Sequence, residues 1–139
     1  MSSETARATI DNLMDLDPYL LFSNAIRSPL TRQKYNGRLS SFFDFISLPP
    51  SRLEDRCRIF VQNCHGNSAY AITWAFKFVV FFKVRMEKKE IEVSTLYNYL
   101  KPIKLLCEMN HVNIKWRKIT VGLYQFTGCP TFTSTLSGT

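Results

Sequence analysis

Apolar side chains recur every three or four residues in several stretches of the chain, which is the period of an amphipathic α-helix. The first such stretch covers residues 31–46, with Thr31 as the predicted N-cap and Pro49-Pro50 ending the segment. The buried stripe of this helix is expected to consist of Tyr35, Leu39, Phe42, Phe43 and Ile46.

A second helix is predicted over residues 52–64, with Ser51 as its N-cap. The turn His65-Gly66-Asn67 ends it, because glycine commonly follows a helix end. Its apolar stripe is expected to consist of Leu53, Cys57, Phe60, Val61 and Cys64.

A third segment, residues 68–88, is apolar on most faces and is therefore expected at the centre of a bundle. Its apolar run is interrupted by Lys77 and Lys83 and is shorter than the roughly 20 residues of a membrane span. The run at residues 79–82 also fits a short buried strand, but the length of the segment and its charged end favour a helix. Its aromatic side chains are expected in the core rather than as a stacking platform for single strands: Trp74, Phe76, Phe78, Phe81 and Phe82.

The fourth predicted helix covers residues 95–109, with Ser94 as its cap and Pro102 as the site of an expected kink. Its core stripe is expected to consist of Leu96, Tyr99, Leu100, Ile103, Leu106 and Cys107. The opposite stripe is formed by Tyr97, Lys101, Lys104 and Glu108.

These segments predict an all-α fold, a small bundle of four or five helices. Residues 1–25 are expected to form an acidic leader, residues 26–118 the helical core domain, and residues 119–139 a disordered low-complexity tail. The tail has no charged residue, and 11 of its 21 residues are Ser, Thr or Gly. At 139 residues the chain has little room for a second, catalytic domain.

The positive charge of the chain is concentrated in its middle block. The formal net charge is +7, yet residues 1–25 hold one arginine and four acidic residues, whereas residues 26–118 hold 17 basic and 7 acidic residues. Such a block indicates a polyanionic partner, because cations that neutralise phosphates release condensed counterions. The candidate phosphate contacts are Arg32, Lys34, Arg38, Lys101, Lys104, Lys115, Arg117 and Lys118.

The sequence gives little indication of a metal site or a catalytic site. The pairs Cys64-His65 and Cys107/His111 do not supply the three or four ligands of a metal site, and no nucleophile–base arrangement or phosphate-binding glycine loop is recognisable. We therefore expect no metal, no cofactor and no small-molecule substrate. The four cysteines form no CxxC pair and no secretion signal precedes them, which favours a reduced, cytoplasmic chain without membrane attachment.

Two stretches carry a family resemblance. The first runs from Asp17 through Asn24 to residue 46 and includes Thr31-x3-Tyr35-x3-Leu39-x2-Phe42; the second covers residues 94–119 and includes Thr95-x3-Tyr99. Together, over residues 17–123, they resemble the N-terminal core-binding domain of tyrosine recombinases (phage-type integrases), in particular archaeal integrase-like proteins.

The resemblance implies a SAM-like helical bundle that clamps one face of duplex DNA. Its first and fourth predicted helices would approach the major groove, with Lys101 and Lys104 on the phosphate backbone. If the fourth helix enters the groove, Thr95, Tyr97 and Asn98 near its start are candidates for contacts with base edges; the alternative is ordinary capping by Ser94 and Thr95. The family's catalytic domain carries two Arg, a Lys, an H-x-x-R motif and a Tyr nucleophile. No H-x-x-R follows His65 or His111, so we expect no strand cleavage by this chain.

Three functions stay open at this point. The chain is expected to be a non-catalytic, nucleoid-associated DNA-binding module, a protein-interaction domain that pairs with itself or modulates a full-length recombinase, or the binding half of a split recombinase. The sequence ends 16 residues after Leu123, so a truncated or frame-altered integrase gene is a further expectation.

Overall fold

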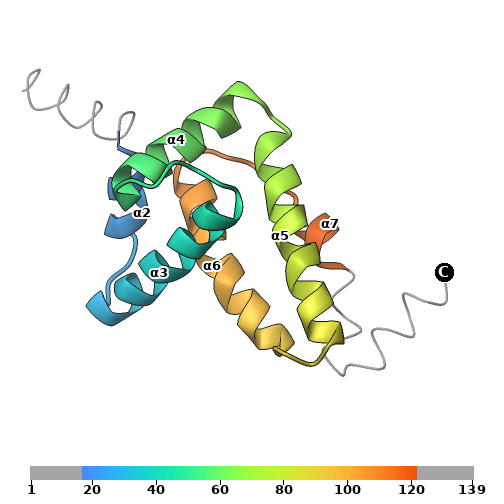
Figure 1. The fold of residues 1–139 in the computed structure, drawn as a ribbon. Helices are drawn as coiled ribbons and strands as arrows, with labels where there is room; N and C mark the ends of the chain where they lie inside the picture. The colour runs from blue at the N-terminus through green and yellow to red at the C-terminus, as the bar shows by residue number, and fades with distance from the viewer. Residues whose placement is uncertain (1–16, 122–139) are drawn as a thin grey trace, which may run out of the picture.

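The fold is built from helices alone in the part of the chain that the structure, a computed structural model, describes, residues 17–121. Six helices follow one another there: α2 (Pro18–Asn24), α3 (Pro29–Phe45), α4 (Leu53–Gly66), α5 (Tyr70–Glu87), α6 (Val93–Met109) and α7 (Trp116–Thr120) (Figure 1). The predicted all-α bundle is therefore confirmed. The segment at residues 79–82 lies inside α5, so the strand alternative is wrong.

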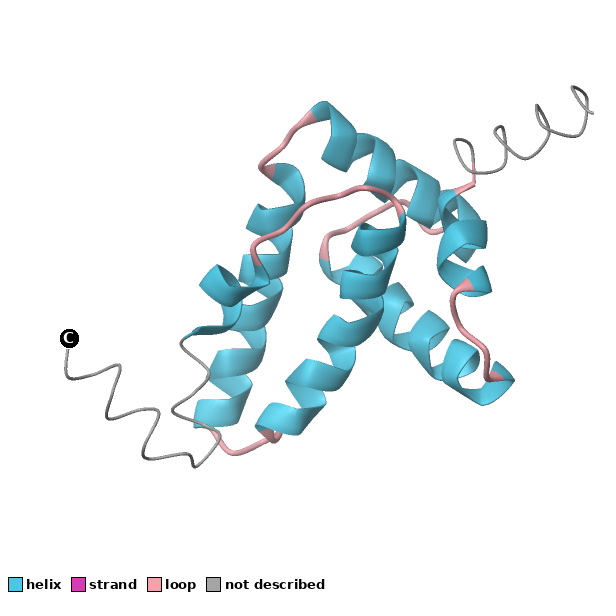
Figure 2. Ribbon diagram, turned by 180° about the vertical axis from the view of Figure 1, so that it is seen from behind, coloured by secondary structure: helices cyan, strands magenta, loops and turns pink. Residues whose placement is uncertain are grey.

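The long helix α6 organises the packing. It lies against α2, α3 and α5, while α2 also contacts α4 and α7 packs on α5. Figure 2, seen from behind, shows α5 and α6 running alongside each other and joined by a short loop. Pro102 is buried within α6, which runs without interruption from Val93 to Met109.

The predicted stripes of α3, α4 and α6 form one core. Leu39, Phe42, Phe43 and Ile46 of the first stripe are buried, as are Cys57, Phe60, Val61 and Cys64 of the second and Leu96, Leu100, Ile103, Leu106 and Cys107 of the fourth. Three predicted members, Tyr35, Leu53 and Tyr99, are only partly buried and pack at its edge.

The core extends beyond both predicted boundaries of the domain. Helix α2 falls within the predicted leader, yet its Phe22 is fully buried. Ile119 of α7 falls within the predicted tail and is buried as well. Bulky apolar residues in short helices thus add to the core without a periodic stripe; residues 122–139, where the rest of the tail was predicted, lie outside the described residues.

The helix N-termini differ from the predicted caps. Ser28 rather than Thr31 caps α3, because the Ser28 hydroxyl accepts a hydrogen bond from the Thr31 amide at 3.2 Å. At α6 the helix begins one residue before Ser94, and no side chain caps it. The predicted turn at residues 65–67 begins later than expected, since α4 continues through Gly66.

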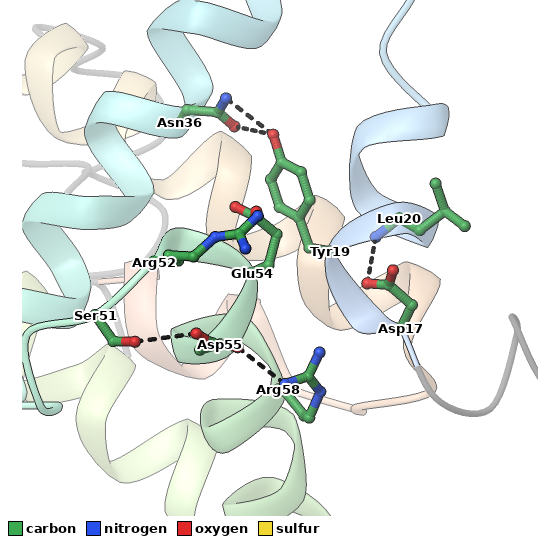
Figure 3. A network of polar contacts seen from close by, with 9 residues as sticks. All are labelled: Asp17, Tyr19, Leu20, Asn36, Ser51, Arg52, Glu54, Asp55 and Arg58. Carbon is green, nitrogen blue, oxygen red and sulfur yellow. Dashed lines mark hydrogen bonds and ion pairs between the residues drawn. The ribbon is translucent and has the colours of Figure 1, made fainter.

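Polar contacts fix the starts of α2 and α4 (Figure 3). Asp17 caps α2 by accepting from the Leu20 amide at 3.1 Å. At α4, Ser51 does not cap the backbone as predicted; its hydroxyl donates to Asp55, which also accepts from Arg58. These two hydrogen bonds hold the pKa of the Asp55 carboxyl below its usual value, Ser51 having the larger effect.

A nearly buried arginine joins α4 to the end of α3. The Arg56 side chain is 9% exposed and donates to Asp44 Oδ1 at 2.8 Å and to the Leu48 carbonyl at 3.2 Å, while Asp44 itself is 72% exposed. The Arg56 guanidinium also lies 5.8 Å from the centre of the Phe43 ring. Because the charge of Arg56 is largely removed from water, its carboxylate partner contributes more to the free energy of unfolding than a carboxylate in an exposed ion pair does.

Replacing Asp44 with alanine is therefore expected to lower the free energy of unfolding by about 1.5–3 kcal/mol, since Arg56 loses its counter-charge. The matched control is Glu90→Ala, which removes the carboxylate from the exposed Arg85–Glu90 pair and should change it by about 0–1 kcal/mol. Urea unfolding measures both. Equal effects of the two substitutions would show that Asp44 does not stabilise Arg56.

Candidate nucleic-acid interface

The exposed stripe of α6 carries the central candidate cations. Lys101, Lys104 and Glu108 are exposed, whereas the opposite side of the helix is buried in the core. This alternation arises because one apolar stripe faces α2 and α3, so that residues two positions away from a buried one, about 200° around the helix, face solvent. Lys101 and Lys104, three residues apart, therefore project from neighbouring positions on one helix face.

Lys104 connects this stripe to α7. Its Nζ lies 5.6 Å from the centre of the Trp116 ring, a cation–π contact at the beginning of α7. Lys104 and Trp116 line a shallow groove together with Glu108, Val112, Asn113 and Ile114. The indole thereby holds the ammonium of Lys104 at the junction of the two helices.

The turn between α6 and α7 is held by a buried amide that the sequence analysis did not single out. Asn110 donates from Nδ2 to the Leu106 carbonyl at 2.9 Å and to the Pro18 carbonyl at 3.2 Å, which ties the turn to α2. The Asn110 carbonyl lies 3.0 Å from His65 Nε2. At His111 the backbone takes φ 58°, a left-handed turn conformation. The contact of the Asn110 side chain with Leu106 is local, but its contact with Pro18 depends on tertiary structure, so no local sequence signal could have identified that contact.

Helix α7 brings three further candidates to the surface. Lys115 precedes the helix, and Arg117 and Lys118 lie within it; all three are exposed. The helix is short and is anchored through the buried Ile119 against α5. Lys104 contacts the start of α7 through Trp116, while Lys118 lines a hollow between α7 and α5. We call the five exposed residues Lys101, Lys104, Lys115, Arg117 and Lys118 the α6–α7 basic cluster.

The candidates on α3 differ among themselves. Lys34 is exposed and Arg38 is half-buried. Arg32 is tied internally, because its Nη2 donates to the Ile26 carbonyl at 2.7 Å and its Nε is buried without a partner. Arg32 therefore holds the α2–α3 connection, and the prediction that it is a phosphate contact is weakened by this structural role.

The candidates for base contacts lie in the first turns of α6. Thr95, Tyr97 and Asn98 are all half-buried, and Tyr97 packs against the core. The prediction of a fully exposed stripe therefore fails at Tyr97, where the helix passes close to its neighbours. Thr95 and Asn98 retain part of their surface.

None of the candidate cations is neutralised by a carboxylate within residues 17–121. The ion pairs of this range join Arg52 to Glu54, Arg56 to Asp44, Arg58 to Asp55 and Arg85 to Glu90. All four use arginines outside the candidate set. The α6–α7 basic cluster consequently holds five cations with Glu108 as a nearby carboxylate, an excess of positive charge that favours an anionic ligand.

The three cysteines among the described residues, Cys57, Cys64 and Cys107, are buried free thiols. Burial raises the pKa of the Cys64 thiol to about 12 and the pKa of Cys57 and Cys107 further still. Each thiol therefore stays protonated at neutral pH, whereas metal ligation and nucleophilic attack need the thiolate. In the described part of the chain, no three His, Cys, Asp or Glu side chains gather closely enough to hold a metal ion.

No helix among residues 17–121 has the length and apolar character needed to cross a bilayer. Comparisons with protein-family models, with curated proteins and with solved structures gave no match to the chain. The resemblance to the recombinase core-binding domain accordingly stays a prediction from the motif residues.

Proposed function

We propose that the chain is a non-catalytic module that binds duplex DNA through the α6–α7 basic cluster. The observation that carries the proposal is the set of five exposed cations without carboxylate partners among the described residues. Such a set suits phosphates, because each neutralised phosphate releases counterions, and the release supplies most of the affinity. An intracellular, nucleoid-associated location goes with this role.

The geometry favours contact with the backbone over sequence readout. Lysine binds phosphate as a point charge, and phosphate contacts set orientation and register without carrying sequence information. Lys104 is further oriented by Trp116, which reduces the side-chain freedom that it would lose on binding. Thr95 and Asn98, at the start of α6, are the polar side chains available for base edges.

The family resemblance supports the same proposal independently of charge. It implies a helical bundle that clamps DNA, with catalysis in a separate domain whose H-x-x-R motif does not follow His65 or His111. The proposed activity is therefore binding without strand cleavage.

The direct test is titration of a labelled duplex with the full chain at several salt concentrations. The plot of log K against log salt is expected to be linear with a slope of about −3 to −6, at about −0.9 per phosphate contacted. Absence of binding at low salt would refute the proposal.

A paired substitution tests the surface itself. Lys101→Gln with Lys104→Gln should flatten the salt slope by about two units, because two phosphate contacts are lost. The matched control is Arg27→Gln with Lys88→Gln, which lowers the net charge equally from exposed positions outside the candidate set. Equal slopes for the two double variants would mean that net charge, and not this helix face, governs binding.

A further inference from the structure

The outward side of α5 exposes large apolar side chains that do not enter the core. Phe76 is 51% exposed, Val80 41%, Phe81 46% and Val84 46%, and together they are four of the seven large apolar residues left exposed in residues 17–121. The prediction that every aromatic side chain of this segment lies in the core is therefore wrong for Phe76 and Phe81, although Phe78 and Phe82 are buried.

Three of these residues form a straight row. Phe76, Val80 and Val84 follow at intervals of four residues, so they lie on one side of α5 over about 12 Å. At Phe76 the row opens into a hollow of about 370 Å³ between α5 and α7, to which Ile72 and Ile119 add apolar surface. The feature is thus a ridge with a concave apolar end.

Positive charges border this row. Lys77 and Lys118 line the hollow, Lys83 lies farther along α5, and Lys88 follows Glu87 directly at the end of the helix. These four lysines are absent from the ion pairs of residues 17–121. Lys77 rests on the Trp74 ring, with its Nζ 4.6 Å from the ring centre.

We propose that this face docks an acidic amphipathic helix of a protein partner. Apolar anchors spaced at three and four residues match the row, the hollow receives one bulky anchor, and carboxylates on the flanks of the partner meet the lysines. If this face paired with the same face of a second copy of the chain, lysines would lie opposite lysines, and their repulsion disfavours such a dimer. A bilayer surface has no protruding side chain to fill the hollow, so the concave end favours a protein.

The probe is a fluorescent synthetic peptide of 18 residues, with leucine at alternating intervals of three and four and glutamate elsewhere. Anisotropy with the full chain is expected to show saturable binding at modest ionic strength. Phe76→Ser with Val80→Ser should weaken it at least tenfold, and Leu30→Ser, at an apolar residue of α3 that is 60% exposed, should leave it unchanged. Circular dichroism verifies that each variant is folded.

Charge reversal distinguishes specific recognition of the acidic peptide from non-specific hydrophobic binding. Lys77→Glu with Lys118→Glu should abolish binding of the acidic peptide and allow binding of its counterpart with lysine in place of glutamate. No peptide binding, or equal loss with Leu30→Ser, would overturn the proposal. The proposal would also be overturned if dimerisation of the chain, or its binding to phosphatidylserine vesicles, depended on Phe76 while peptide binding did not. Duplex binding by the Phe76/Val80 variant should stay unchanged, so the DNA proposal stands or fails separately.

Discussion

Replacing Phe42 with alanine is expected to lower the free energy of unfolding by about 3–5 kcal/mol. Phe42 is fully buried, and its ring meets Phe60 of α4 edge-on at 5.6 Å and Phe78 of α5 at 5.0 Å between centroids. One side chain thus joins three helices. Its removal loses the transfer free energy of the ring and leaves a cavity that α3, α4 and α5 close only in part.

Urea unfolding followed by tryptophan fluorescence measures this loss, with Trp74 and Trp116 as the reporters. The matched control is Phe76→Ala, the same chemical change at an exposed site, which should alter stability by no more than about 0.5 kcal/mol. The free energy of unfolding of a domain of this size is about 5–15 kcal/mol in total. The Phe42 variant should therefore unfold at a clearly lower urea concentration. Indistinguishable midpoints would show that the aromatic cluster is not the centre of the core.

The contrast between these two phenylalanines marks what the sequence could predict. Where a helix has one apolar stripe, as α3 does at Leu39, Phe42 and Phe43, the period alone identifies the buried side. Helix α5 is apolar nearly all round, so its pattern does not say which side faces the core. Packing against α3 and α6 buries Phe78, whereas Phe76 lies beside the hollow between α5 and α7 and stays exposed.

The side-chain contacts of Arg32 and Asn110 could likewise not be predicted from the helical period. The Arg32 side chain was predicted as a phosphate contact because its charge is visible in the sequence, but its hydrogen bond to Ile26 depends on the turn before α3. Asn110 reaches Pro18 across 92 residues, which no spacing rule describes. For Lys101 and Lys104 the helical period was sufficient, because their exposure follows from the buried stripe on the same helix.

The second large effect is a loss of stability at alkaline pH. Burial raises the pKa of Cys64 from 9.0 to about 12 and raises the pKa of Cys57 and Cys107 as well, so these thiols stay protonated in the folded chain. In the unfolded chain they ionise near pH 9, and unfolding then releases protons. The stabilisation is complete below that pH and is lost as the pH rises, by about 1.4 kcal/mol per pH unit for each thiol.

With three such thiols the free energy of unfolding is expected to fall by about 4 kcal/mol per pH unit above pH 9.5, measured by urea unfolding between pH 8 and 11 in the presence of a reductant. Lysines and tyrosines titrate in the same range, so the decisive comparison is with Cys64→Ala. That variant keeps every other titrating group except one thiol, and its slope should be shallower by about 1.4 kcal/mol per pH unit. Parallel slopes would mean that Cys64 ionises as readily in the folded chain as in the unfolded one, which is incompatible with its burial against α6.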